Sequence, residues 1–352
     1  MTSDAIRQTG SGTIPYRPSF LDRFMDSVER LPVPYWLTYL GLFLVEVALL
    51  HILAWVDGWI PFYTFKPIIL VFPIWLWVPM TIMTYLDSVS LKALSIFNSL
   101  LDIDEEELKR LKYEFTTMPN RGVILSGVFW GINYLILTYL GYETFYVSYG
   151  LGSLLSAAVF FTGLVSYLTG SAIYYHSFRQ LSLVNRTVKM VRQFNLFRLD
   201  PVYAFSRVTS LIGVSWMLML TLTLLTLPIQ LATGLGLAIM AVQVVLAIAA
   251  FVLPLWFVHR RLVSEKRRLI AELDQRVEST LERLHHGLDK NELEDVDHFS
   301  NAMMGMGAER EVLVNIPTWP WRSDTLAGFL SAVVLPIVLY LIQLLIEKLM
   351  SG

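Results

Sequence analysis

The sequence contains no cysteine, and only 16% of its 352 residues are charged, against about 25% in an average soluble domain. The lack of cysteine excludes disulfide bonds, thiolate metal sites and cysteine nucleophiles. The small charged fraction, with 55% apolar residues, excludes a disordered chain, an ordinary cytosolic enzyme and a basic protein that binds nucleic acid. The formal net charge of −2 is an average over a very uneven distribution.

Long apolar runs occupy the parts of the chain that lack charge. A transmembrane helix needs about 20 mostly apolar residues, and residues 208–259 hold no Asp, Glu, Lys or Arg at all. Pro228 and the turn-like residues 232–234 divide that run into two spans. The complete set of seven predicted spans is 35–56, 68–86, 122–140, 147–175, 208–227, 235–258 and 325–346. The expected fold class is all-α, a polytopic membrane protein with a cytoplasmic helical bundle.

Lysine and arginine are concentrated on one side of these spans. If the N-terminus is inside, all of the 27 basic residues except Lys66 and Lys348 fall on the inner side. Cytoplasmic loops carry an excess of Lys and Arg, so we expect the N-terminus inside and the C-terminus outside. We expect the plasma membrane or an inner membrane as the location. We expect no secretory signal within residues 1–34, because they lack a continuous apolar core.

Residues 1–34 are expected to form a cytoplasmic N-terminal amphipathic segment. Its apolar residues recur at helical spacing and are Phe20, Leu21, Phe24, Val28 and Leu31. Charged residues such as Asp22 and Arg23 fill the other face. Such a helix lies on the inner membrane surface or packs on the cytoplasmic part of the protein, and the pattern leaves both open.

Residues 35–258 hold the first six spans, and two inner segments, 87–121 and 176–207, extend them into the cytoplasm. In the first segment Asp104 and Glu107 resemble a capping box that opens a short helix. In the second, an apolar stripe that begins at Leu181 follows directly from the fourth span. We therefore expect the fourth span to continue straight out of the membrane.

Residues 259–322 form the largest inner segment, which we expect to be a helical anchor region, and residues 323–352 hold the seventh span. The sixth span continues into a charged helix, and a second helix is expected from about Asn291 to Met304, where glycines break it. The apolar stripe of the first helix includes Leu269, Leu273, Val277, Leu281 and Leu284. These residues are candidates for packing in a helical bundle, either within one subunit or between subunits.

Polar groups inside a membrane span are costly, so they are candidates for function. Glu46 is the only carboxylate deep inside a predicted span, and Asn133 and Gln243 are further candidates. For Glu46, a buried structural hydrogen bond is the competing interpretation. In the seventh span Tyr340 and Gln343 are three residues apart and share one helix face.

Catalytic signatures are missing from the sequence. It has no H-E-x-x-H metal motif, no phosphate-binding P-loop, no G-x-S-x-G nucleophile elbow and no dinucleotide-binding glycine motif that opens a helix. The pair His285–His286 ends a charged helix and is expected to be solvated rather than metal-bound. We therefore predict no enzyme activity, no metal site and no cofactor.

This arrangement of spans resembles the seven-transmembrane ion channel superfamily, which includes the insect odorant and gustatory receptors. Those proteins share seven spans with an inner N-terminus, long fourth to sixth helices, and a last helix split into a cytoplasmic half and a membrane half. Here residues 291–304, or that segment through Asn315, match the cytoplasmic half, and residues 325–346 match the membrane half.

A motif in the last helix carries part of the same resemblance. Gustatory receptors have Thr-Tyr, five apolar residues and Gln-Phe, whereas this chain has a shorter Leu339-Tyr340-Leu341-Ile342-Gln343-Leu344 without the Thr and Phe. The resemblance implies a homotetramer held together by the cytoplasmic helices, with the last span around a central cation pore. Leu339, Tyr340 and Gln343 would then be pore-lining candidates.

Three functions are compatible with the sequence. The first is a homo-oligomeric ion channel or ligand-gated receptor that takes ions or a small-molecule ligand. The second is a non-catalytic membrane scaffold or signalling protein whose cytoplasmic bundle binds a partner. The third is an intramembrane enzyme or transporter that acts on lipid, and the missing catalytic motifs and the missing inverted repeat weigh against it.

Overall fold

The computed structural model describes residues 15–142, 152–191, 194–197, 199–226, 234–289 and 296–351, and this part of the chain is all-α. The helices are α2 (Phe20–Glu29), α3 (Tyr35–Val56), α4 (Val71–Phe97), α5 (Glu105–Thr116), α6 (Asn120–Leu140), α7 (Ser153–Val165), α8 (Ala172–Lys189), α9 (Asp200–Thr226), α10 (Gly234–Asp289), α11 (Val296–Asn315) and α12 (Ser323–Ser351). Short 3₁₀ turns at Pro67–Leu70 and Asn98–Leu100 flank α4.

Seven of the described helical segments are long and apolar enough to cross a membrane. They are Tyr35–Val56, Pro67–Leu100, Asn120–Leu140, Leu154–Lys189, Asp200–Thr226, Met240–Asp289 and Ser323–Ile346. Each contains or overlaps one of the seven spans that the sequence predicts, which confirms an all-α chain with seven candidate spans. The orientation of the spans and the cytoplasmic helical bundle stay predictions. The chain is a multi-pass integral membrane protein.

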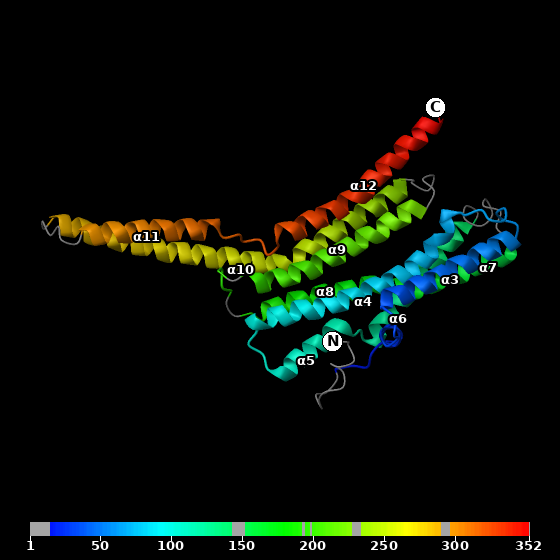
Figure 1. The fold of residues 1–352 in the computed structure, drawn as a ribbon, viewed down its shortest axis with the longest axis horizontal. Helices are drawn as coiled ribbons and strands as arrows, with labels where there is room; N and C mark the ends of the chain where they lie inside the picture. The colour runs from blue at the N-terminus through cyan, green and yellow to red at the C-terminus, as the bar shows by residue number, and fades with distance from the viewer. Residues whose placement is uncertain are drawn as a thin grey trace.

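Helix α9 lies at the centre of the molecule, where α4, α10 and α12 pack against it (Figure 1). In the most apolar stretch of α9, 61% of the residues are buried, the largest share among the seven spans. The ring of Phe205 on α9 lies 4.5 Å from that of Phe97 on α4, and Trp75 Nε1 donates a 3.0 Å hydrogen bond to the hydroxyl of Thr223. These contacts make α9 the most buried of the seven spans.

The fourth span is built from α7 and α8, joined by one π-helical turn at Ser166–Gly170. Gly170 lies so close to α4 that a Cβ atom there would be 1.8 Å from the carbonyl oxygen of Trp75. The hydroxyl of Ser166 donates a 2.9 Å hydrogen bond to the carbonyl of Phe72, also on α4. The small residues of this span therefore permit close helix contact.

Helix α10 continues far beyond the sixth span, as the sequence predicted. Its 56 residues correspond to about 84 Å at the usual 1.5 Å rise per residue. The C-terminal part of α10 and the antiparallel α11 form a two-helix hairpin that projects at the left of Figure 1, away from the other helices. We use the name α10–α11 hairpin for residues 259–289 together with residues 296–315.

The prediction that glycines break the second hairpin helix was wrong, because α11 runs unbroken through Gly305 and Gly307 to Asn315. A glycine inside a helix costs only about 1 kcal/mol relative to alanine, and packing of α11 on α10 outweighs that cost. Leu313 is 1% exposed, and Lys266 Nζ donates to the Val314 and Ile316 carbonyls at 2.6 and 2.9 Å. The predicted start at Asn291 lies outside the described residues.

Helix α2 packs on the protein, which is one of the two arrangements that the sequence left open. Leu21, Met25 and Val28 are buried and belong to the same apolar core as Phe115 of α5. Ser19 and Asp22 form a capping box at the start of α2. The described part of the N-terminal segment is therefore a structural component of the bundle.

Candidate functional site

The three intramembrane polar candidates have separate structural partners and do not come together. The indole of Trp77 donates a hydrogen bond to Glu46 across α3 and α4. Asn133 Nδ2 donates to the carbonyl of Phe129 at 2.9 Å within its own helix. Gln243 Nε2 donates to the carbonyl of Trp216 at 3.1 Å, from α10 to α9.

Two of the three pore-lining candidates contact another helix of the same chain. Gln343 Nε2 donates a 3.0 Å hydrogen bond to the carbonyl of Leu224 on α9. Tyr340, on the same face of α12, is 8% exposed, and Leu339 beside it is partly exposed. Gln343 thus bonds a second span of its own chain, and a pore-lining role for these residues stays a prediction.

The five anchor candidates lie along one stripe of the α10–α11 hairpin. Leu273 is 2% exposed, and Leu269, Val277, Leu281 and Leu284 are partly buried, while most charged residues between them are exposed. Arg310 of α11 reaches Asp274 of α10 at 2.7 Å. The stripe is thus the seam between the two hairpin helices, and its role in oligomer assembly stays a prediction.

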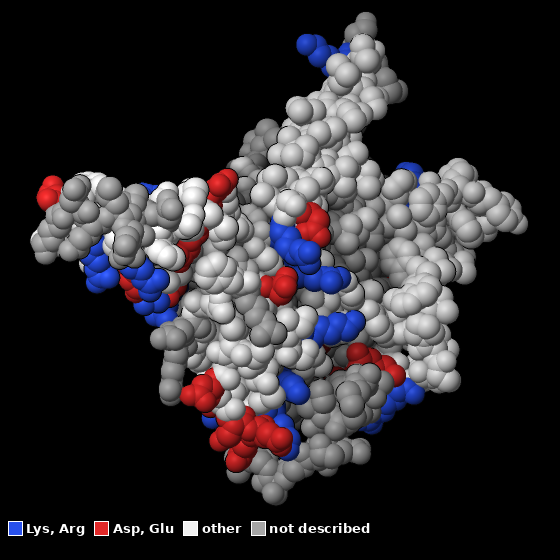
Figure 2. Space-filling view, turned by 60° about the vertical axis from the view of Figure 1, so that its left-hand side comes forward, with Lys and Arg blue, Asp and Glu red and all other residues white. Residues whose placement is uncertain are grey.

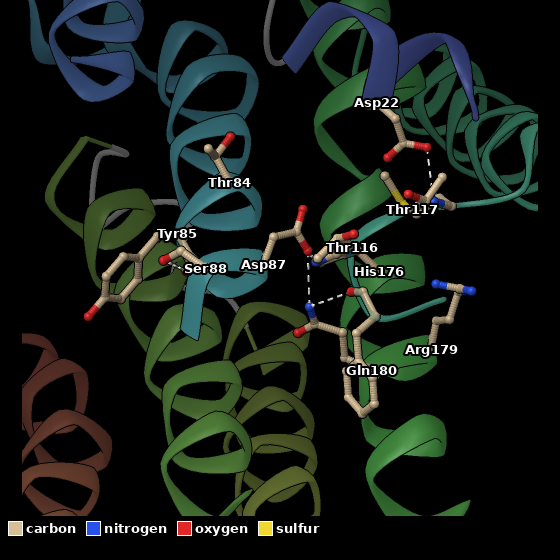
Figure 3. A network of polar contacts seen from close by, with 12 residues as sticks. Asp22, Thr84, Tyr85, Asp87, Ser88, Thr116, Thr117, His176, Arg179 and Gln180 are labelled. Atoms are coloured by element: carbon tan, nitrogen blue, oxygen red, sulfur yellow. Dashed lines mark hydrogen bonds and ion pairs between the residues drawn. The ribbon is translucent and has the colours of Figure 1, made fainter. Parts of the chain in front are cut away.

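The structure also brings together a polar network that sequence reasoning did not assemble (Figure 3). His176 Nε2 on α8 lies 3.1 Å from Oδ1 of Asp87 on α4. Gln180, one turn farther along α8, donates from Nε2 to the same Asp87 oxygen and to the carbonyl of Phe115, both at 3.2 Å. His176 and Gln180 are 1% and 0% exposed, whereas the side chain of Asp87 is 17% exposed.

Asp22 of α2 is the centre of a second group of buried hydrogen bonds next to this network. Its Oδ2 accepts hydrogen bonds from the backbone N–H of Ser19 at 2.9 Å, the hydroxyl of Ser19 at 2.8 Å and the N–H of Met118 at 2.9 Å. Its Oδ1 has no hydrogen-bond partner among the described residues. Burial raises the pKa of Asp22 above its usual range, and the bonds from Ser19 and Met118 oppose that rise.

A third set of polar contacts connects the N-terminal segment with α5 and α8. Arg179 donates to the carbonyl of Glu114 and to the hydroxyl of Tyr16, and Arg186 and Arg110 pair with the Glu114 carboxylate. Tyr16 in turn donates to the Thr117 carbonyl at 2.8 Å. Burial raises the pKa of Tyr16 well above its ordinary value, so the phenol stays a neutral donor.

A cavity of about 280 Å³ lies between α2, α4 and the end of α5. Four acidic residues line it, two of them from the nodes above: Asp22, Asp26, Glu29 and Asp87. Hydroxyl-bearing residues from α4 and α5 also line it: Thr84, Ser88 and Thr116. The cavity is thus lined mainly by acidic and hydroxyl side chains, and three of its four acidic residues come from α2. We call it the α2–α4 cavity.

Sequence reasoning missed this cavity because no local motif marks it. Asp87 and His176 stand at the inner ends of two different predicted spans, and Asp22 stands in the polar face of a short amphipathic helix. One usable signal was the matching depth of Asp87 and His176, since charges at the ends of neighbouring spans often pair. The burial of Asp22 depends on the docking of α2, which the sequence left open.

Within the described residues, no group of three or more His, Cys, Asp or Glu side chains has an arrangement that could hold a metal ion. Comparison with protein-family models, with curated proteins and with solved structures gave no match. The chain is therefore characterised by its own geometry: seven spans, a central α9, a projecting hairpin and an acidic cavity.

Proposed function

We propose that the chain is one subunit of a homo-oligomeric ion channel or ligand-gated receptor, in which α12 lines the pore and the α10–α11 hairpin assists assembly. The observation that carries the proposal is the position of α12. It packs on α9, yet only 22% of the residues in its most apolar stretch are buried. In Figure 1 its C-terminal end also extends away from the other helices.

The face of α12 that is turned away from α9 is continuously apolar. The buried face carries Phe329, Val333 and Tyr340. About half a helical turn away lies a row of exposed aliphatic residues, which are Val334, Val338, Leu341 and Leu345. Residues 325–346 contain no charge, so a pore lined by this row would close by excluding water.

The α10–α11 hairpin supports an assembly of several copies. Two helices bury little core by themselves, and the outer surface of this hairpin keeps large apolar residues exposed: Leu288, Met304, Val312 and Val314. Packing between copies at the hairpin would cover such residues. This is the role that the resemblance to the channel superfamily assigns to the cytoplasmic helices, and a tetramer is the expected number of copies.

The orientation belongs to the same proposal, with the hairpin and α2 on the cytoplasmic side. Figure 2 shows charged side chains gathered over the hairpin end and the lower part of the molecule, while the projecting helix at the top is bare except at its tip. A reporter fused after Gly352 should read as outside, and a reporter inserted at Lys290 should read as inside. If both reporters read as inside, the result would contradict the proposed topology.

The functional test is a current recording from purified protein in a planar bilayer. We expect cation current from the unmodified chain and a several-fold rise in open probability for Val338→Asn, because a polar side chain wets an apolar constriction. Leu44→Asn is the matched control, since Leu44 is 54% exposed on α3, on the far side of the bundle from α12. The channel proposal would be contradicted if neither the unmodified chain nor Val338→Asn gave a current. It would also be contradicted if Val338→Asn and Leu44→Asn changed the open probability equally.

The scaffold function is the alternative, and the same exposed hairpin residues favour it, because a partner protein could cover them instead of a second copy. A scaffold predicts a monomer without current whose hairpin binds another protein. A channel predicts a defined oligomer that conducts a cation current.

A further inference from the structure

We propose that the contact between α8 and α10 at Lys189, Phe257 and Arg261 is a binding site for the headgroup of an anionic phospholipid. The phosphate binds at the two cations, and the acyl chains follow the exposed face of α10 into the membrane. This proposal is independent of channel activity, because it concerns lipid binding alone, so a failure of either proposal leaves the other standing.

Two cations from different helices meet at one aromatic ring. The ammonium of Lys189, in the last turn of α8, lies 6.0 Å from the ring centroid of Phe257 on α10. The guanidinium carbon of Arg261, one turn farther along α10, lies 5.8 Å from the same centroid. Like charges repel, and an aromatic ring offsets an exposed cation by only about 0.5–1 kcal/mol. An anion shared by both cations would therefore be stabilised here.

The acidic residues nearest to these cations along the two helices, or packed beside them, are engaged by other arginines. On α10 the first acidic residue is Glu265, and both of its carboxylate oxygens accept from Arg268. Helix α8 contains no Asp or Glu, and the Glu114 carboxylate of α5 pairs with Arg186 of α8. Lys189 is exposed and forms no ion pair with a described residue. Its charge is thus available to a ligand.

The end of α8 fixes the position of Arg261 through neutral groups. Arg261 Nη2 donates a 3.3 Å hydrogen bond to the carbonyl of Val191, and its guanidinium carbon lies 6.0 Å from the ring centroid of Phe194. A carbonyl acceptor orients the guanidinium without cancelling its charge. The side chain is exposed, and the planar fork of N–H donors on arginine suits the oxygens of a phosphate.

The cations lie at the level where α10 leaves the membrane. Residues 208–259 carry no Asp, Glu, Lys or Arg, and Phe257 lies at the end of that stretch. Trp256 beside it is 47% exposed, and its ring lies 5.8 Å from that of Trp319, in the segment before α12. Tryptophan side chains gather at the headgroup level of a bilayer. A lipid phosphate is therefore the anion that reaches Lys189 and Arg261.

An exposed apolar face of α10 continues from the cations into the membrane. Leu253, one turn before Phe257, is 67% exposed. Leu246 and Val242 follow on the same face and are also exposed. A molecule that joins a phosphate to acyl chains matches both the cations and this face, whereas a soluble phosphate matches the cations alone. Bound lipid would link α8 to α10 where α10 continues into the hairpin.

The test is native mass spectrometry of the full chain in detergent, titrated with dioleoylphosphatidylglycerol or dioleoylphosphatidylcholine. The two lipids share their acyl chains and differ in net charge, and we expect the anionic lipid to bind about fivefold more tightly. Lys189→Gln with Arg261→Gln should abolish this preference. Arg276→Gln with Arg283→Gln is the matched control, because it removes the same charge from exposed positions farther along α10. The control should keep the preference.

A charge-conserving variant and a single variant complete the test. Arg261→Lys should keep most of the preference that Arg261→Gln loses, since the charge rather than the shape of the side chain is retained. If the double variant fails to fold, Lys189→Gln alone changes an exposed side chain whose contact is one ring, and it should lower the preference about twofold.

Three results would overturn the proposal. The first is equal binding of both lipids by the unmodified chain. The second is an unchanged preference in the folded variants of Lys189 and Arg261, or an equal loss in the control of Arg276 and Arg283. The third is displacement of dioleoylphosphatidylglycerol by inorganic phosphate, because the site would then bind a soluble anion rather than a lipid.

Discussion

The centre of the bundle and α12 are both apolar spans, but they are completed in different ways. The most apolar stretch of α9 is 61% buried, and that of α12 is 22% buried. Around α9, side chains and backbone carbonyls are satisfied within one chain, as the bond from Trp75 to Thr223 shows. Helix α12 offers an unbroken apolar face to whatever surrounds the subunit. The comparison indicates that the chain folds its own centre and leaves α12 and the hairpin for lipid or for other copies.

The largest effect is expected where the centre is tightest. Gly170→Ala puts a Cβ atom 1.8 Å from the Trp75 carbonyl oxygen, so the π-helical turn at Ser166–Gly170 must move away from α4, at a cost of about 3 kcal/mol or more. We expect loss of folded protein, measured by expression and by thermal melting in detergent.

Gly41→Ala is the matched control, because a Cβ atom at Gly41 meets nothing within 4 Å. Alanine in an open helical position gains about 1 kcal/mol over glycine, so this variant should melt at the same temperature or higher. Equal melting of the two variants would show that the π-helical turn at Ser166–Gly170 does not approach α4 as described.

The next largest effect is expected in the hairpin. Leu273 is 2% exposed, so Leu273→Asp buries a carboxylate without a partner at a cost of about 3 kcal/mol. We expect the hairpin to open and the oligomer to dissociate, measured by native mass spectrometry. The control Leu288→Asp alters a side chain that is 45% exposed, and an oligomer lost in both variants would argue against a buried seam.

A smaller effect is expected at the polar node of α5. Glu114 is 5% exposed and pairs with Arg110 and Arg186, so Glu114→Ala leaves two arginines without their carboxylate. The arginines are themselves about half exposed, and solvent screening limits the loss to about 2 kcal/mol. Thermal melting measures this loss, and an unchanged melting temperature would show that Tyr16 and Arg179 hold α5 without the carboxylate.

The smallest effect is expected at the surface of the hairpin. Arg310 and Asp274 form an ion pair whose side chains are 56% and 47% exposed, and such pairs contribute below about 1 kcal/mol. Arg310→Ala should lower the melting temperature by a degree or two at low salt and by less at high salt. A loss as large as that of Leu273→Asp would mean that this pair is buried in the assembly.

Periodicity and apolar length made much of this fold predictable from the sequence. The long α10 follows from an apolar stripe that continues past the membrane, and the cap of α5 follows from Asp104, whose side chain accepts from the N–H of Glu107 at 2.7 Å. Helix α11 was misjudged because helix propensity weighs Gly305 and Gly307 locally, whereas packing on α10 decides the outcome. The α2–α4 cavity could not be predicted, since it depends on long-range docking that places Asp22 beside α4.

The central claim is that α12 lies between copies of the chain, and the natural absence of cysteine makes a direct test available. Leu341→Cys places the sole thiol on the α12 face that is turned away from α9, and Leu44→Cys places it on α3 as a control. In native membranes under mild oxidation, α12 at the symmetry axis predicts disulfide-linked dimers of Leu341→Cys and none of Leu44→Cys. Leu341→Cys that stays monomeric while the protein remains folded would contradict this account and place α12 against lipid.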